Sequence, residues 1–378
     1  MKRSDLDCLL RAAVLDGGVP GVVAGATDRS GLVYLGAFGS AAAGTQQPMR
    51  PETVFRLASM TKLVTSIAVL QLAAEGRVDV DAPFGRCLPE YRQPPVLRSF
   101  DFAQRRYETQ PARRDVTVRD LLTHTAGYGT WFLNPELRVL AGPKPEYYNA
   151  PFLICEPGSR FQYGTSTDVV GQLVPALSGL RLDEYFAQRI LTPLGMRDTA
   201  YVAPADTTRL AAVHVRAPTG FVAQPPEPPE APRGGAGLFG TVADYLALLR
   251  MLLNGGRAAG RQVLDADAVA ALTSNQIGDL MAVRQTTAAP ERTSDFAFMD
   301  GTQKFGFGVM IETHARQSGR AAGSYAWAGI FNTFFWVDPA AGIAAVVCMQ
   351  LSPFCTPASL AVCDAFEAEL YRQLGFTA

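Results

Sequence analysis

The chain has 378 residues, of which 48% are hydrophobic and 18% are charged, and its formal net charge is −1. This composition predicts a folded protein with a large core and excludes a disordered or fibrous chain. No run of lysine or arginine indicates a surface for nucleic acid or for an acidic membrane. The expected partner is therefore a small neutral or weakly charged molecule, and the sequence leaves the oligomeric state open.

The first part of the chain predicts a helix, a hairpin and a second helix. Residues 1–18 have the pattern of an amphipathic helix, and two aspartates interrupt what would have to be an apolar signal segment. Residues 19–39 contain two Val- and Gly-rich runs around the turn DRSG, which predicts an antiparallel hairpin. Residues 60–76 have apolar residues at helical spacing up to Gly76. No apolar run approaches the roughly 20 residues that span a bilayer, so we expect a cytoplasmic protein.

The rest of the chain predicts helices followed by strands. Residues 83–299 read as short helices joined by loops, and one loop, 224–237, has glycines that permit backbone to approach a cleft closely. From Phe305 onward successive strands precede a closing helix at 357–374. We therefore expect an α+β fold, in which 1–82 and 300–378 form an antiparallel sheet with terminal helices. A mainly helical segment, 83–299, is inserted, and the active site lies at the junction.

Cysteine and histidine patterns do not predict a metal site. The six cysteines form no CxxC pair, and no HExxH motif occurs among the three histidines. We expect most of the cysteines to be buried thiols. No metal and no organic cofactor is expected.

The stretch RLASMTK places Ser59 three residues before Lys62, at the start of the second predicted helix. Residues three apart on a helix lie on one face, so the ammonium of Lys62 can reach the hydroxyl of Ser59. A serine needs such a partner to become a nucleophile, and the helix N-terminus favours an oxyanion. The alternative is a serine near a helix start with an outward-pointing lysine. No GxSxG elbow or GxGxxG loop offers a competing site.

Further motifs carry a family resemblance over nearly the whole chain. RLASMTK is followed by LLTHTAGYG, FQYGTSTDVVG, PLGMRDT, GGAGLFGT and WAGIFNTFFWVDP. This series resembles the family of class C β-lactamases, D-alanyl-D-alanine carboxypeptidases and family VIII carboxylesterases. The resemblance implies the β-lactamase/transpeptidase-like fold. It also implies that Ser59 is the nucleophile, that Lys62 activates it and that Tyr163 shuttles protons to the leaving group.

The third motif of the family falls on Trp327, Ala328 and Gly329. The resemblance implies that this strand edge lines the cleft and that the N–H groups of Ser59 and Ile330 form the oxyanion hole.

Two positions depart from the pattern of β-lactamases and peptidases, because Thr165 replaces an asparagine and Trp327 replaces a lysine or histidine. Without that cation, selectivity for an anionic substrate loses its physical basis. Family VIII carboxylesterases are similar in having Trp-x-Gly here, which favours neutral esters.

Residues around the LLTHTAGYG segment are weaker candidates. Tyr128, Trp131 and Phe132 are candidate substrate-pocket residues, although clustered aromatics are more often core. His124 is interpreted as structural, bonding to backbone within its turn. Asp168 is assigned no role.

The leading functional hypothesis is hydrolysis of short- to medium-chain carboxylic esters through an acyl-serine. Acyl transfer to an alcohol is a close alternative, because PVLRSFDFAQRR also resembles the lovastatin-type acyltransferase branch. Amide or β-lactam hydrolysis ranks third. A binding protein without catalysis ranks last, because Ser59, Lys62 and Tyr163 are all present.

Overall fold

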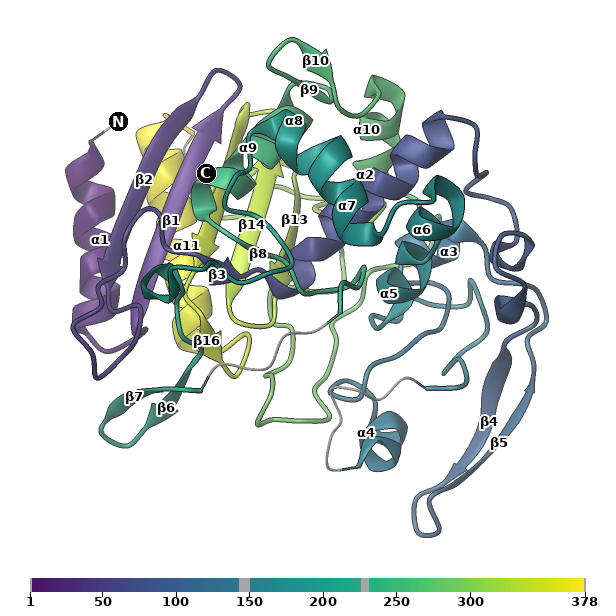
Figure 1. The fold of residues 1–378 in the computed structure, drawn as a ribbon. Coiled ribbons are helices and arrows are strands. Elements are labelled where there is room, and N and C mark those ends of the chain that lie inside the picture. The colour runs from purple at the N-terminus through teal and green to yellow at the C-terminus, as the bar shows by residue number, and fades with distance from the viewer. Residues whose placement is uncertain (1, 143–149, 226–230, 377–378) are drawn as a thin grey trace.

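The computed structural model describes residues 2–142, 150–225 and 231–376. Both ends of the chain contribute to one seven-stranded antiparallel sheet, as predicted (Figure 1). In spatial order its strands are β11 (Lys304–Phe305), β12 (Met310–Ile311), β13 (Tyr325–Gly329), β14 (Thr333–Asp338), β15 (Ile343–Cys348), β1 (Gly21–Asp28) and β2 (Leu32–Gly39). The N-terminal hairpin joins the C-terminal strands through β1 and β15, where Val23 pairs with Cys348.

Helices cover both faces of this sheet. On one face, Phe366 of α11 (Pro357–Gln373) packs against Tyr34 of β2 and Trp336 of β14, and α1 (Arg3–Leu15) lies beside α11. On the other face, Tyr245 of α9 (Val242–Leu253) packs against Phe335. Neighbouring residues of a strand point to opposite faces. Covering both faces explains why β13, β14 and β15 are buried throughout.

Helix α2 (Thr61–Ala74) runs between the sheet and the smaller helices. It follows a 3₁₀ turn at Ala58–Met60, is buried from Thr61 to Leu72, and ends before Gly76, whose φ of +71° suits glycine. The other α-helices are α3 (Val118–Leu122), α4 (Pro135–Ala141), α5 (Ser166–Gly171), α6 (Leu173–Ser178), α7 (Leu182–Phe186), α8 (Thr192–Leu194) and α10 (Ala266–Leu272), with a π-helix at Ala187–Leu191. Short 3₁₀ turns occur at Phe84–Arg86, Pro89–Tyr91 and Thr207–Arg209.

The segment 83–299 differs in two ways from the predicted helical insert. It contains a protruding hairpin, β4 (Pro95–Asp101) and β5 (Arg106–Pro111), and a smaller pair, β6 (His214–Ala217) and β7 (Gly220–Ala223) (Figure 1). In addition, α9 belongs with the sheet, because it packs on β1 and β15. The remaining short strands are β3 (Phe55–Arg56), β8 (Phe239–Gly240), β9 (Arg257–Ala258), β10 (Arg261–Gln262) and β16 (Leu351–Ser352).

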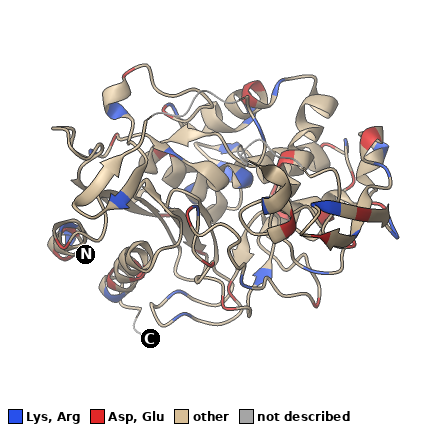
Figure 2. Cartoon of the chain, turned by 90° about the horizontal axis from the view of Figure 1, so that it is seen from below, with Lys and Arg blue, Asp and Glu red and all other residues tan. Residues whose placement is uncertain are grey.

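The distribution of charged side chains and the length of the apolar helices agree with what the composition predicts. Basic and acidic side chains are interspersed along the fold (Figure 2). None of the helices in the described part of the chain is long and apolar enough to cross a bilayer. All six cysteines are free, but only Cys348, Cys355 and Cys363 are buried, so the expected burial of most of them is only half met.

His214 is a buried titratable group that joins three segments of the fold. Its Nε2 accepts the N–H of Ala43 at 3.0 Å, and its Nδ1 lies 3.3 Å from the carbonyl oxygen of Gln350. This arrangement requires a neutral imidazole with its proton on Nδ1. Burial lowers the pKa of His214, although the bond to Gln350 opposes this effect.

Because the folded state resists protonation of His214, the unfolded state takes up a proton that the folded state does not. His214 therefore does not lower the free energy of unfolding above pH ~6.5. At lower pH it lowers this free energy by up to about 1.4 kcal/mol per pH unit. Urea unfolding of the wild type and His214→Gln between pH 7.5 and pH 5 measures this slope. The variant should show a shallower loss, and equal slopes would contradict the assignment.

Candidate active site

Ser59 lies in a constrained turn at the N-terminal end of α2. The preceding residue, Ala58, has φ +48°, a left-handed conformation that costs free energy in a residue other than glycine. Pairing of β3 with β8 and a bond of 2.8 Å from the N–H of Leu57 to the carbonyl oxygen of Leu238 hold the turn from one side. The serine is thus presented by a backbone whose strain the surrounding structure sustains.

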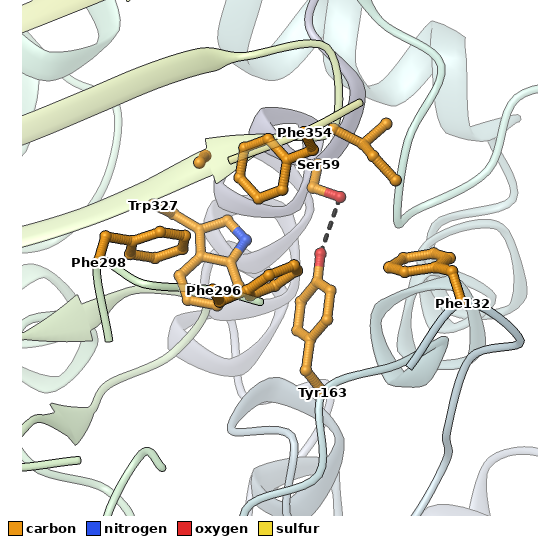
Figure 3. A pocket seen from close by; sticks show the side chains of 9 residues that line it. Ser59, Phe132, Tyr163, Phe296, Phe298, Trp327 and Phe354 are labelled. Atoms are coloured by element: carbon orange, nitrogen blue, oxygen red, sulfur yellow. Dashed lines mark hydrogen bonds between the residues drawn. The ribbon is translucent and has the colours of Figure 1, made fainter. Parts of the chain in front are cut away.

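Lys62 and Tyr163 both donate hydrogen bonds to the hydroxyl oxygen of Ser59. The distance from Nζ of Lys62 to Oγ is 3.2 Å. The phenol oxygen of Tyr163 lies 2.8 Å from Oγ, as the dashed line in Figure 3 marks. The ammonium also lies 5.2 Å from the centroid of the Tyr163 ring. Lys62 and Tyr163 are only 5% and 4% exposed, so bulk water competes little for these bonds. The structure therefore brings together the three residues that the sequence singled out.

A second acceptor for Lys62 comes from the glycine-rich segment before β8. The ammonium donates to the carbonyl oxygen of Gly235 at 2.7 Å, and Asp168 accepts the N–H of Gly235 at 2.8 Å. A Cβ at position 235 would lie 2.6 Å from a carboxylate oxygen of Asp168, so a larger residue there would displace this carboxylate. Asp168, which was assigned no role from the sequence, thus fixes the peptide that holds the lysine. This part of the loop approaches the site as its glycines predicted, while 226–230 lie outside the described residues.

The end of β13 forms the opposite wall of the site. Strand β12 pairs with β13 only at Tyr325 and Ala326, so among the described strands none continues along Trp327 to Gly329 on that side. A Cβ on Gly329 would lie 2.4 Å from the carbonyl oxygen of Leu57. Glycine therefore allows the strand end to touch the turn that carries Ser59.

The pocket beside Ser59 is almost entirely aromatic and aliphatic. It encloses about 250 Å³ of empty space, counting its open mouth. Its lining consists of Ser59, Phe132, Tyr163, Phe296, Phe298, Trp327, Ala328, Ile330 and Phe354 (Figure 3). Apart from the reactive groups, this lining presents an apolar surface to a substrate.

The structure separates the predicted pocket residues into two groups. Phe132, Trp327, Ala328 and Ile330 line the pocket, whereas Tyr128, Trp131 and Gly329 do not. Trp131 packs instead against Phe132 and the guanidinium of Arg138, and burial raises the pKa of the Tyr128 phenol. Tyr128, Trp131 and Phe132 all lie near the LLTHTAGYG segment in the sequence. This proximity did not indicate that only Phe132 faces the pocket. The oxyanion-hole role of Ser59 and Ile330 stays a prediction.

Three lining residues, Phe296, Phe298 and Phe354, were missed by the sequence interpretation. Phe296 and Phe298 alternate in the stretch SDFAFMD, but this stretch belongs to no helix or strand in the structure. Phe354 lies in the irregular turn between β16 and α11. Alternation at 296 and 298 was the only signal, and it did not indicate which element the rings would face.

His124 contributes a neutral wall behind Tyr163. Its ring centroid lies 4.7 Å from that of Tyr163, and it packs on Phe161 and Phe305. Its ring nitrogens have no hydrogen-bond partner among the described residues, so the expected bond to backbone is wrong. Burial, and then the charge of Lys62, hold the pKa of His124 well below its usual range. The imidazole therefore stays uncharged beside the lysine.

This geometry suits covalent catalysis by serine. A hydroxyl between a cation and a phenol, at the floor of an apolar pocket, can exchange its proton over one hydrogen bond while attacking a carbonyl carbon. Within the described residues, no group of three or more His, Cys, Asp or Glu side chains is placed to hold a metal ion.

Comparisons with known proteins agree with this fold. A family model described as Beta-lactamase matches residues 6–359. Monacolin J acid methylbutanoyltransferase of Aspergillus terreus is 29% identical, and the match covers 97% of this chain and 95% of the transferase. Esterase EstB of Burkholderia gladioli is also 29% identical, over 90% of this chain and 88% of the esterase. The structure of a simvastatin synthase mutant from Aspergillus terreus superposes with a TM-score of 0.83 at 28% identity, over 98% of this chain and 99% of the synthase.

The fold and these matches define a serine hydrolase or acyltransferase of the β-lactamase/transpeptidase type. The chain belongs to the beta-lactamase family. The resemblance drawn from its motifs and the predicted fold class are thereby confirmed.

Asp168→Ala should lower kcat by about tenfold with little change in KM, because losing one partly buried hydrogen bond frees the Gly235 peptide that positions Lys62. Asp168→Asn is the matched control, since its amide oxygen can still accept the Gly235 N–H, and it should retain most of the activity. Steady-state kinetics with p-nitrophenyl butyrate measure both variants. Equal rates for Asp168→Ala and the wild type would contradict a positioning role.

Proposed function

We propose that this protein is a serine carboxylesterase that hydrolyses short- to medium-chain esters through an acyl-Ser59 intermediate. The observation that carries the proposal is the pair of hydrogen bonds, 3.2 Å and 2.8 Å long, from Lys62 and Tyr163 to the Ser59 oxygen. Both partners are buried, and Ser59 and Tyr163 line a pocket with apolar walls.

In the proposed reaction the phenol of Tyr163 first loses its proton to solvent, and the Lys62 ammonium stabilises the resulting phenolate. Ser59 Oγ then attacks the ester carbonyl carbon, and its proton passes to the phenolate oxygen of Tyr163. When the tetrahedral intermediate collapses, the bond to the alcohol oxygen breaks and Tyr163 returns the proton to that oxygen. Water then attacks the acyl-Ser59, loses a proton to Tyr163 and releases the carboxylic acid, after which the proton returns to Ser59.

Trp327 supports an uncharged ester as the substrate. Its ring lies 5.1 Å from that of Tyr163 and 6.0 Å from that of Phe298, and it is 3% exposed. An indole at this place provides an apolar wall where a lysine or histidine would bind a carboxylate. β-Lactam and peptide substrates carry such a carboxylate, and we therefore rank them below neutral esters.

Acyl transfer to an alcohol is the second candidate, favoured by the match to the methylbutanoyltransferase over 97% of this chain. The two reactions share the acyl-Ser59 step and differ only in whether water or an alcohol removes the acyl group. The ratio of acid to new ester, measured while the concentration of a bulky alcohol is raised, separates them. Mainly acid supports the esterase, and mainly ester at low alcohol concentration supports the transferase.

We propose the cytoplasm as the location of this activity. The six cysteines are unpaired in the structure, which fits a compartment that keeps thiols reduced.

Ser59→Ala should abolish turnover of p-nitrophenyl butyrate, because no nucleophile remains. Lys62→Ala and Tyr163→Phe should each lose at least about 100-fold in kcat, the usual effect of removing a positioned proton-transfer group. Stopped-flow or steady-state release of p-nitrophenolate measures all three variants.

Ser66→Ala is the matched control for Ser59→Ala. Ser66 lies on α2 two turns further along, is fully buried, and its hydroxyl has no hydrogen-bond partner among the described residues. This variant should retain wild-type turnover. Wild-type rates in Ser59→Ala would show that another residue is the nucleophile. Wild-type rates in Tyr163→Phe would show that Tyr163 does not transfer the proton.

A further inference from the structure

A second cavity lies on the far side of β13, between the sheet and α11. It encloses about 460 Å³ of empty space, counting its opening, and shares Phe298, Trp327 and Ala328 with the pocket at Ser59. Nothing in the proposed hydrolysis of a short ester uses this space. Because it shares these lining residues with the reactive pocket, the cavity raises the question of what part of a substrate it accepts.

The pattern of small and large residues in the sheet creates the cavity. Ala326 pairs with Trp336 and Ala328 with Phe334, so all four side chains point toward α11. The two alanines leave space that larger residues would fill, and Leu360 and Cys363 of α11 close it from above. The walls are therefore apolar over most of their length.

Phe298 separates the two spaces at the edge of β13. Its ring lies 6.0 Å from that of Trp327, on the Ser59 side of the strand, and 6.5 Å from that of Phe334, on the α11 side. The ring is partly exposed rather than locked in the core. Since β12 pairs only with Tyr325 and Ala326, no described strand blocks the edge at Ala328. A chain leaving Ser59 can thus turn around this edge beside Phe298.

The far end of the cavity is a cluster of mutually paired charges. Arg320 lies 3.1 Å from Glu312 and 3.5 Å from Glu367, and Arg316 lies 3.0 Å from Glu312 and 3.7 Å from Asp364. Because each guanidinium already contacts carboxylates, the cluster offers no unpaired cation to an acidic headgroup. An uncharged occupant fits the cavity, and the charged cluster sets a limit to its length.

We propose that this cavity is the subsite for the acyl chain of longer esters, which passes Phe298 and lies against Ala326 and Ala328. The inference rests on the proposed acyl-Ser59 intermediate and adds the direction of its chain. Each methylene that enters the cavity should raise kcat/KM about fourfold, corresponding to about 0.8 kcal/mol of burial.

Filling the cavity tests the proposal through chain-length preference. Ala326→Leu and Cys363→Leu add bulk from opposite walls and should lower kcat/KM for p-nitrophenyl decanoate by about tenfold or more, with p-nitrophenyl acetate within about twofold of wild type. Ala361→Leu adds the same atoms on the exposed face of α11 and should leave both esters unchanged. The proposal is wrong if the cavity variants that fold keep the wild-type ratio of kcat/KM for the decanoate to kcat/KM for the acetate.

A crystal structure after treatment with p-nitrophenyl octylphosphonate locates the chain directly. In this reaction Ser59 Oγ bonds to phosphorus, p-nitrophenolate leaves and the serine proton passes to solvent. Density for the octyl chain against Ala326 and Ala328 supports the subsite. A phosphonylated Ser59 whose chain lies against Phe132 overturns the subsite while preserving the proposed function. Failure to modify Ser59 overturns both.

Discussion

The position of one buried ammonium governs the arrangement of the whole site. Lys62 is 5% exposed, and a buried cation is costly unless it is paired or hydrogen-bonded. Its acceptors come from two distant segments, the Ser59 turn and the carbonyl oxygen of Gly235. Several features follow from this requirement: the β3–β8 pairing, the carboxylate of Asp168 on Gly235, and the absence of a side chain at that glycine.

The incomplete edge of the sheet is the second constraint. A full-length β12 would pair along all of β13 and cover the strand end beside Ser59. Its two residues instead leave Trp327 and Ala328 free to face the pocket, and Gly329 allows contact with the Ser59 turn. The same edge lies between the spaces on the two sides of the sheet, which share Phe298, Trp327 and Ala328 in their linings. Reactivity and the proposed chain selectivity therefore both depend on where one strand pairing stops.

Local patterns were sufficient to predict the sheet, α2 and the residues around Ser59. The hairpin of β1 and β2, the buried helix ending at Gly76 and the spacing of Ser59 and Lys62 are all short-range features. The convergence of Tyr163 on the serine was implied by the family resemblance and not by spacing.

What the sequence did not predict depends on contacts between distant segments. The role of Asp168 requires knowing that residue 235 returns beside it, 67 positions later. Phe296, Phe298 and Phe354 lie in irregular segments, where no periodicity indicates which way a ring points. Likewise α9 was placed in the insert, because its amphipathic pattern does not indicate that its apolar face packs on the sheet.

The most direct test of the account is intact-mass spectrometry of the protein quenched during turnover of p-nitrophenyl butyrate. If Ser59 is the nucleophile held by Lys62 and Tyr163, a fraction of the protein should gain the mass of one butyryl group, and peptide mapping should place it on Ser59. The adduct should be missing in Ser59→Ala. Turnover with no adduct in the wild type, or an adduct that persists in Ser59→Ala, would contradict the account.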